Sequence, residues 1–349
     1  MKKPELIANE DLNKKSSLAH LRNKIICGET YEVLRKIPSK SVSLIVTSPS
    51  YFLGKSYEKS QKFKEYLKDN QQIIKECKRI LKDNGAIFWN VAQTIVDGEV
   101  LPLGAFYYDI FKKEGFFLKN WIILKFEGGE TPRSRLFGRY ENILWFVKNN
   151  KDYIFNLDDI RVPSKWINDK RCNKNGKNPE DFWIFDERSN IDKVRNVRKK
   201  IKEFKKLLSQ DSDQYVNQIL MDEIFRNLEN ELDEVINSKN NIVNKNLPSN
   251  IWHINRVVNI SKAQKIKHPI TKETHPCPFP EALIQRIIKM ATNQNGLVVD
   301  IFAGSGTVAK VAQDLKRNWI CIEKEMKYCE IAKHRLDINN QKGKQLKLF

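Results

Sequence analysis

Three short apolar runs in this chain are each followed by a polar or glycine-containing turn. Residues 43–47 (SLIVT) lie near the N-terminus, whereas residues 298–301 (VVDI) and 319–322 (WICI) lie near the C-terminus. Runs of this length predict strands that are buried on both faces, as in a parallel sheet covered by helices. Only 26 of the 349 residues follow Glu323, so the rest of such a sheet has to come from the N-terminal half.

The central part of the chain has a different pattern. From residue 180 to residue 247 there is no Gly and no Pro, and apolar residues recur at helical spacing. The polar residues 209–214 interrupt this spacing, so we expect an antiparallel helical hairpin over residues 186–240. Its first helix is rich in Lys and Arg, and its second helix is more acidic.

The glycine turn after residues 298–301 has the layout of a nucleoside-cofactor site. Gly304 and Gly306 allow a sharp turn and let a ligand approach the N–H groups that open the next helix, which favour an anion. Glu323 follows Asp300 by 23 residues and is expected at the tip of the neighbouring strand, where a carboxylate can accept both ribose hydroxyls. The same glycines also fit a dinucleotide-binding pattern, and a plain strand-to-helix turn is the alternative.

A second unusual turn follows residues 43–47. Pro49 cannot continue a central strand, so this strand should end near Thr47 and present Ser48, Ser50 and Tyr51 beyond its carboxyl edge. Ligands bind at that edge in open α/β sheets. An ordinary β-turn favoured by Ser and Pro is the alternative interpretation.

Together, the two turns resemble the permuted motif order of the β-class DNA amino-methyltransferases. That family has a Ser/Asp-Pro-Pro-Tyr-like turn near the N-terminus and a Phe-x-Gly-x-Gly turn, here 302–306, near the C-terminus. Further segments resemble family motifs in the same order: residues 28–29 (GE), 85–91 (GAIFWNV), 140–148 (YENILWFVK), 156–163 (NLDDIRVP), 251–256 (IWHINR) and 275–280 (HPCPFP). The resemblance covers most of residues 25–335, apart from a central insertion.

The resemblance implies an α/β fold with a doubly wound, mostly parallel sheet of the S-adenosylmethionine-dependent methyltransferase type, circularly permuted, with a smaller helical target-recognition region. Residues 1–150 would form the catalytic half of the methyltransferase domain, residues 151–265 the target-recognition region with the hairpin, and residues 266–340 the cofactor-binding half. The residues implied to bind S-adenosylmethionine are Glu29, Phe279, Pro280, Asp300, Phe302, Gly304, Ser305, Gly306, Thr307 and Glu323.

The same resemblance makes Ser48, Pro49, Ser50 and Tyr51 the catalytic turn. The Ser48 hydroxyl and the Pro49 carbonyl would accept hydrogen bonds from the exocyclic amine of a base, and Tyr51 would stack on the base. Such an amine is a poor nucleophile because its lone pair is delocalised into the ring, so it has to be held in line with the methyl donor. In this family, Ser at the first position usually accompanies cytosine-N4 transfer, whereas Asp or Asn accompanies adenine-N6 transfer. Ser50 replaces the second proline of the family's turn, which would leave the loop less preorganised.

Composition agrees with a nucleic-acid partner. The chain has 62 Lys and Arg against 43 Asp and Glu, a net charge of +19, and such a surface is drawn to a phosphate backbone. We expect double-stranded DNA as the partner, with the target base flipped out and stacked on Tyr51. The residues expected to contact DNA are Arg133, Arg135, Arg139 and Lys55.

Two charged segments have more than one interpretation. Residues 54–68 form either a mobile loop that closes over DNA or, from about residue 62, the start of a helix. The helical hairpin over residues 186–240 either reads DNA, joins two copies into a homodimer, or pairs and solvates its own charges.

Cysteine spacing and hydropathy set further bounds. The six cysteines show no C-x-x-C pair and no histidine spacing typical of zinc, so we expect neither a metal site nor a disulfide framework. Cys277, in a Pro-Cys dipeptide, is interpreted as a packing residue. The N-terminal sequence has no apolar core for a signal peptide, and no apolar run reaches the ~20 residues that span a bilayer. We therefore expect a soluble, cytoplasmic protein.

The leading hypothesis is a DNA methyltransferase that transfers a methyl group from S-adenosylmethionine to cytosine N4 in a specific double-stranded sequence, as part of a restriction-modification system. An adenine-N6 methyltransferase and a catalytically silent DNA-binding relative, the latter suggested by Ser50, are the alternatives. A dinucleotide-dependent oxidoreductase is disfavoured, because its glycine turn would normally open the chain and residues 48–51 would have no role.

Overall fold

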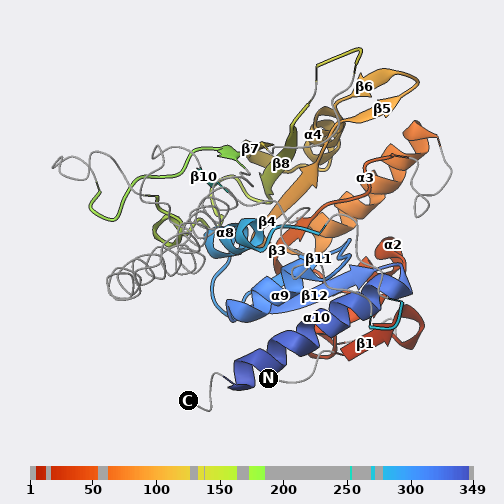
Figure 1. The fold of residues 1–349 in the computed structure, drawn as a ribbon, viewed down its shortest axis with the longest axis vertical. Coiled ribbons are helices and arrows are strands. Elements are labelled where there is room, and N and C mark those ends of the chain that lie inside the picture. The colour runs from red at the N-terminus through yellow and green to blue at the C-terminus, as the bar shows by residue number, and fades with distance from the viewer. Residues whose placement is uncertain are drawn as a thin grey trace, which may run out of the picture. The chain divides into compact units, whose positions relative to one another are not determined.

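The computed structural model describes residues 5–12, 17–53, 62–125, 133–136, 138–162, 173–184, 252–253, 269–271 and 278–345. Among these residues, ten strands form one sheet in the order β1-β2-β12-β11-β3-β4-β8-β7-β9-β10 (Figure 1). Neighbouring strands of this sheet are parallel except at β8, which runs opposite to β4 and β7. The predicted doubly wound, mostly parallel α/β sheet is confirmed.

The centre of the sheet joins strands from both ends of the chain. Its parallel strands are β2 (Lys24–Cys27), β3 (Val42–Thr47), β4 (Leu81–Val91), β11 (Leu297–Asp300) and β12 (Asn318–Glu323). The outer strands are β1 (Glu5–Ala8), β7 (Phe117–Lys125), β8 (Tyr140–Val147), β9 (Phe182–Ile184) and β10 (Trp252–His253), and a separate hairpin pairs β5 (Thr94–Val96) with β6 (Glu99–Leu101). Because β11 pairs directly with β3, the permuted order expected from the sequence is present in the fold.

Helices cover both faces of the sheet and enclose two apolar cores. One core lies under α8 (Glu281–Ala291), α9 (Thr307–Asp314) and α10 (Met326–Gln345). The other lies under α2 (Thr30–Leu34), α3 (Phe63–Ile80) and α4 (Leu103–Lys113). Along β3, Leu44 and Val46 enter the first core and Ile45 enters the second, while Val42, which precedes an irregularity in the pairing with β4, also enters the second. Side chains alternate across a strand, so a strand buried on both faces has the unbroken apolar run seen in the sequence.

Three short helical segments complete the described elements. They are η1 (Asn9–Asp11), α1 (Leu18–Leu21) and η2 (Leu157–Asp159). Helix α3 begins at Phe63, so the second interpretation of residues 54–68, a helix from about residue 62, is confirmed. No helix within the described ranges is both long and apolar enough to cross a membrane.

The chain divides into two compact units. The first comprises Met1–Arg161, Asn178–Phe185 and Trp252–Phe349, and the second comprises Val162–Lys177 and Asp186–Ile251. In the second unit, a bridge pairs Val162 with Lys177. The expected helical hairpin over residues 186–240 lies outside the described residues, and the domain boundaries expected from the sequence stay predictions.

The strand order reverses between β3 and β11. From β11 the chain passes through α9 to β12 on one side, and from β3 it passes through α3 to β4 on the other side. The crevice beyond the carboxyl ends of two such strands is the usual ligand site of an open α/β sheet. Thr47 ends β3 and Asp300 ends β11, so both turns singled out in the sequence begin at this point.

Candidate functional site

A buried hydrogen bond joins the ends of β3 and β11. The Thr47 hydroxyl donates to Asp300 Oδ1 at 2.8 Å, and the same oxygen accepts from the Phe302 N–H at 3.2 Å. Asp300 is only 1% exposed, and this burial raises the pKa of its carboxyl to about 7, although both hydrogen bonds oppose the shift. Asp300 therefore ties the start of the glycine turn to the strand that carries the other turn.

The glycine turn is held against the tip of β12. The Gly304 N–H donates to Glu323 Oε2 at 2.7 Å, and the Glu325 N–H donates to Oε1 at 2.9 Å. Burial raises the pKa of Glu323. Each carboxylate oxygen can accept more than one hydrogen bond, so Glu323 can hold the turn and still accept from a ligand hydroxyl.

Gly306 is required by both backbone conformation and space. Its φ is +73°, in the left-handed region, and a Cβ there would lie 2.8 Å from the Cβ of Ala332 on α10. This close approach places the first turn of α9 directly on α10. The N-terminus of α9 begins just after the carboxyl end of β11, at the edge of the sheet where ligands bind in this class of fold.

The segment 28–29 lies beside the same carboxylate residue. The Gly28 N–H donates to the main-chain oxygen of Glu323 at 2.9 Å. Glu29 is exposed and forms an ion pair with Lys324 at 3.1 Å. Three segments that are distant in the sequence, ending β2, β11 and β12, thus meet at one edge of the sheet.

Three apolar residues predicted to bind cofactor lie around this edge. Phe302 is half-buried, and its ring centroid lies 6.2 Å from that of Trp89 in an edge-on arrangement. Phe279 is half-buried against the first core, and Pro280 is the N-cap residue of α8. The start of α8 lies near the glycine turn, because its first residue, Glu281, and Thr307 of α9 contact the same arginine, Arg335.

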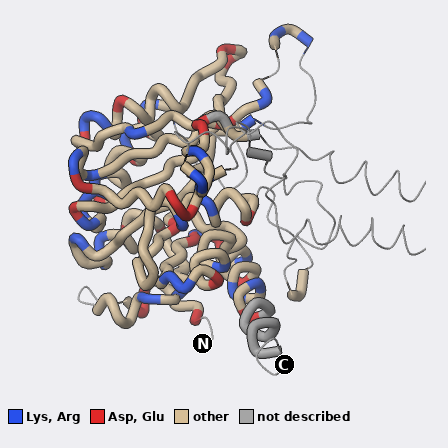
Figure 2. Tube along the Cα trace, turned by 90° about the vertical axis from the view of Figure 1, so that its left-hand side faces the viewer, with Lys and Arg blue, Asp and Glu red and all other residues tan. Residues whose placement is uncertain are grey.

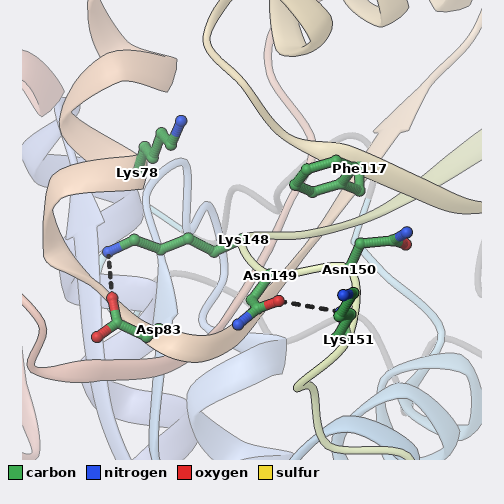
Figure 3. A pocket seen from close by; sticks show the side chains of 7 residues that line it. All are labelled: Lys78, Asp83, Phe117, Lys148, Asn149, Asn150 and Lys151. Carbon is green, nitrogen blue, oxygen red and sulfur yellow. Dashed lines mark hydrogen bonds and ion pairs between the residues drawn. The ribbon is translucent and has the colours of Figure 1, made fainter.

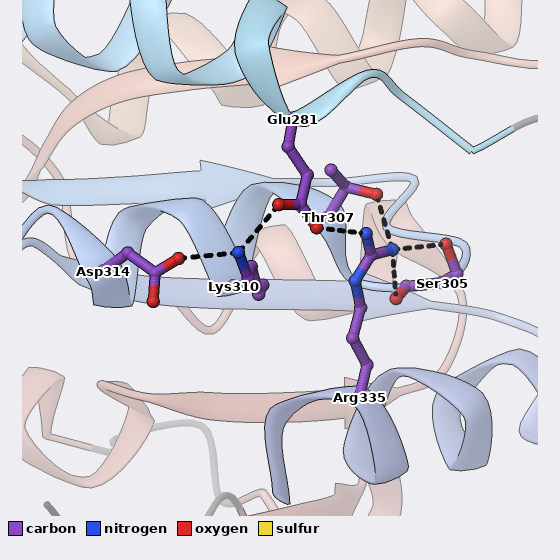
Figure 4. A network of polar contacts seen from close by, with 6 residues as sticks. All are labelled: Glu281, Ser305, Thr307, Lys310, Asp314 and Arg335. Carbon is purple, nitrogen blue, oxygen red and sulfur yellow. Dashed lines mark hydrogen bonds and ion pairs between the residues drawn. The ribbon is translucent and has the colours of Figure 1, made fainter. Parts of the chain in front are cut away.

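The hydroxyls of Ser305 and Thr307 both contact α10 (Figure 4). Arg335 Nη1 donates to Ser305 Oγ at 3.2 Å and to Thr307 Oγ1 at 2.9 Å. Arg335 Nη2 pairs with Glu281 Oε1 at 2.8 Å, and Lys310 donates to the other Glu281 oxygen at 2.7 Å. Ser305 and Thr307 are only 4% and 3% exposed, so their side chains lie in the protein interior and stabilise the turn through Arg335. No motif in the sequence singled out Arg335.

The turn 48–51 continues directly from β3. Pro49 is buried, whereas Ser48, Ser50 and Tyr51 are partly exposed. The Ser50 carbonyl accepts a hydrogen bond of 2.6 Å from the Tyr66 hydroxyl of α3. This contact anchors the turn at the position where the resembling family has a second proline.

Asn90 and Glu141 also meet this turn, although sequence reasoning did not single them out. The Ser48 and Tyr51 hydroxyls lie 2.8 Å apart. Asn90 Nδ2 donates to the Tyr51 hydroxyl at 2.9 Å and to Glu141 Oε2 at 2.6 Å, and the Tyr51 hydroxyl donates to Glu141 Oε2 at 3.4 Å. Asn90 is 5% exposed, and its Oδ1 has no hydrogen-bond partner among the described residues. The antiparallel pairing of β4 with β8 brings the two residues together, and no local sequence pattern reveals that pairing.

The residues predicted to contact DNA lie at the surface where the structure describes them. Arg133 and Arg135 are exposed, Arg139 is partly exposed just before β8, and Lys55 lies outside the described residues, as does Cys277. Lys and Arg are spread over the part of the chain that the structure describes (Figure 2). The distribution of positive charge therefore does not indicate which surface would bind DNA. Within the same residues, no group of three His, Cys, Asp or Glu side chains could hold a metal ion.

A cavity of about 490 Å³ lies at the opposite edge of the sheet (Figure 3). Its lining residues are Lys78, Asp83, Phe117, Lys148, Asn149, Asn150 and Lys151. Asp83 lies at the start of β4 and Phe117 opens β7, so the cavity is at the edge where these parallel strands begin. Lys148 forms an ion pair with Asp83 at 3.4 Å. The candidate site residues lie at the other edge.

The chain is similar to known proteins in sequence and in fold. A family model described as DNA methylase matches residues 42–334. The type II methyltransferase M.BglII of Bacillus subtilis is 31% identical over 322 residues, which are 89% of this chain and 68% of that protein. The solved structure of PvuII DNA methyltransferase (cytosine-N4-specific) aligns with a TM-score of 0.54 and 18% identity over 91% of each chain. TTHA0409 of Thermus thermophilus, solved in complex with S-adenosyl-L-methionine, aligns with a TM-score of 0.50 and 20% identity over 90% of this chain and 93% of that one.

Proposed function

Because this chain belongs to the N6/N4 DNA methylase family, we propose that it methylates the exocyclic N4 amine of cytosine in a specific double-stranded DNA sequence. The observation that carries the proposal is the junction of two turns at the reversal of strand order. Thr47 and Asp300 join the strand that ends in Ser48 to the strand that ends in the glycine turn. An acceptor for an amine and a site for a nucleoside cofactor therefore lie at neighbouring strand ends.

The cofactor is S-adenosylmethionine, and the residues at this edge fit it. When bound, it would supply an electrophilic methyl group carried on a positively charged sulfur, which the base nitrogen would take up in exchange for one of its own protons, with the neutral thioether as the leaving group. The turn, with positive φ at both Gly304 and Gly306, would present main-chain N–H groups to the ligand, and Glu323 would accept the ribose hydroxyls. Glu29 would face the adenosine, and the apolar side chains of Phe302, Phe279 and Pro280 would line the remainder. Asp300, Ser305 and Thr307 would hold the turn in shape.

The catalytic turn would hold the amine. Ser48 Oγ and the Pro49 carbonyl would accept hydrogen bonds from its two N–H groups, which keeps the nitrogen lone pair directed at the methyl group. The Tyr51 ring would stack on a base flipped out of the duplex. The Tyr66 bond to the Ser50 carbonyl supports an active enzyme over a catalytically silent relative, because it anchors the turn despite the missing proline.

The choice of base rests on Ser48. Serine at this position favours cytosine N4, and adenine N6 is the alternative because the family includes both amine types. We also propose that the protein belongs to a type II restriction-modification system, because its relative M.BglII is named a type II methyltransferase. The segment 151–265 would read the DNA sequence, and Arg133, Arg135, Arg139 and Lys55 would contact phosphates.

Methyl transfer from labelled S-adenosylmethionine to unmodified genomic DNA tests the proposal. After digestion to nucleosides, mass spectrometry should find the label in N4-methylcytosine, and single-stranded DNA of the same composition should be a poorer substrate. Label in N6-methyladenine would establish the alternative base. Tight DNA binding without transfer to either amine would contradict the proposed activity.

A further inference from the structure

We infer that Asn90 and Glu141 are positioning residues that direct the Ser48 hydroxyl hydrogen toward Tyr51, so that Ser48 meets the substrate amine only as an acceptor. The inference rests on the proposed function of Ser48 and extends it to two residues outside the catalytic turn. It follows from the hydrogen bonds that converge on one hydroxyl group, that of Tyr51.

The Tyr51 hydroxyl can donate only one hydrogen bond. A tyrosine hydroxyl carries one hydrogen and accepts on its oxygen, whereas an ionised carboxylate only accepts. Glu141 Oε2 lies 3.4 Å from the Tyr51 oxygen, so the tyrosine hydrogen is drawn toward Glu141. The Tyr51 oxygen then has no hydrogen left for Ser48.

The Asn90 amide fixes the other side of the same oxygen. Asn90 Nδ2 lies 2.9 Å from the Tyr51 oxygen and 2.6 Å from Glu141 Oε2, so one amide group donates to both. If the Asn90 amide were rotated by half a turn, Oδ1 would face the Glu141 carboxylate. Two acceptors would then be in contact, so this orientation is excluded. The orientation in the structure leaves Oδ1 buried and without a hydrogen-bond partner among the described residues. Buried polar groups are normally paired. In this orientation the Asn90 Oδ1 lacks a partner in the described part of the chain, whereas Nδ2 donates to both Tyr51 and Glu141.

A third contact of the Tyr51 oxygen is with Ser48 Oγ at 2.8 Å. Since the tyrosine hydrogen is directed at Glu141, this contact is made by the Ser48 hydrogen, with Tyr51 as the acceptor. Both lone pairs of Ser48 Oγ are then left for the amine. If Tyr51 donated to Ser48 instead, the Ser48 hydrogen would point at an N–H group of the substrate, and two donors would face each other.

The sheet makes this arrangement rigid. Asn90 lies near the end of β4, and Glu141 lies at the start of β8, in strands that pair along six positions from Ala86↔Val147 to Val91↔Asn142. Ser48 follows β3, which pairs with β4 on the other side. Three neighbouring strands therefore hold the acceptor, the amide and the carboxylate in fixed register, independently of the cofactor.

Glu141→Gln tests the inference. The glutamine amide can donate to the Tyr51 oxygen, so the Tyr51 hydrogen is no longer directed at residue 141 and can point at Ser48. The full-length protein is assayed in single turnovers on unmodified genomic DNA that the wild type methylates. We expect methyl transfer to slow by about 10²-fold, in the range of losing one preorganised polar contact at a reacting centre. The dissociation constant for S-adenosylmethionine and the midpoint of thermal unfolding should stay at the wild-type values. Glu141→Asp should recover part of the rate, and Glu99→Gln, the same change at an exposed position of β6, should match the wild type.

The Ser48→Ala background separates positioning from a merely structural role. If Glu141 acts through Ser48, adding Glu141→Gln to Ser48→Ala should change the residual rate by less than about twofold. An equal loss in both backgrounds, or a Glu141→Gln rate equal to that of the wild type, would overturn the inference. A wild-type protein that transfers no methyl group would instead refute the proposed function, so the two failures are distinct.

Discussion

The substitution Asp300→Asn should change how the stability of the protein depends on pH. Burial raises the pKa of the Asp300 carboxyl from 3.8 to about 7, and Thr47 and the Phe302 N–H donate to it. In the unfolded chain the same carboxyl titrates near its ordinary value of ~3.9. Between these two values the folded protein holds a proton that the unfolded chain has lost. The free energy of unfolding therefore falls as pH rises from about 4 to about 7, and this contribution is constant above that range.

The size of the effect follows from the shift. It spans roughly three pH units at ~1.4 kcal/mol each, so this one group removes up to about 4 kcal/mol of stability between pH 4 and pH 7. Asparagine keeps an oxygen acceptor for Thr47 and Phe302 but does not titrate. The stability of Asp300→Asn relative to the wild type should accordingly rise by up to about 4 kcal/mol across that range.

Urea unfolding of both proteins at a series of pH values measures this difference. The difference curve is needed because burial also raises the pKa of Glu323, which adds to the pH dependence of both proteins. Thr47→Val is the matched variant: it removes a bond that lowers the Asp300 pKa, so the fall in stability should extend to higher pH. Parallel pH curves for the wild type and Asp300→Asn would refute the reasoning.

Three further substitutions test the supports of the site. Gly306→Ala should lower the free energy of unfolding by about 1–3 kcal/mol more than Gly98→Ala, because both glycines have positive φ but only residue 306 would collide with Ala332; equal losses in urea unfolding would contradict this. Arg335→Met should lower the free energy of unfolding by ~3 kcal/mol, because Ser305, Thr307 and Glu281 lose their shared donor. It should also weaken S-adenosylmethionine binding in calorimetry, and an unchanged affinity would contradict the role of these hydrogen bonds in holding the turn. Tyr66→Phe should slow single-turnover methyl transfer without changing cofactor affinity, because the Ser50 carbonyl loses its anchor, and an unchanged rate would show that the turn needs none.

The strand ends could be predicted closely from the sequence. β3 ends at Thr47, β11 at Asp300 and β12 at Glu323, as the apolar runs and the turns after them indicated. Strands buried on both faces have few polar positions, and a proline or glycine turn ends them, so the signal is local. Recognising that the two turns belong to one site needed the resemblance, because local patterns do not show which strands are neighbours.

The side-chain partners of the site could not be predicted. Asn90 and Glu141 are separated by 51 positions and meet only because β8 inserts antiparallel beside β4. The resemblance implies that Ser305 binds cofactor, which stays a prediction, but it gave no sign that the Ser305 hydroxyl accepts a hydrogen bond from Arg335 on α10. Such contacts depend on how helices and strands pack in three dimensions, and neither spacing nor hydropathy encodes that directly.

The most direct test is to map modified bases in the DNA of cells that express the wild-type protein or Ser48→Ala. The wild type should place N4-methylcytosine at one short recurring sequence, and Ser48→Ala should leave that sequence unmethylated or nearly so. Equal methylation by the two proteins, or methyl groups on cytosine C5 instead of an exocyclic amine, would contradict a transfer reaction centred on Ser48.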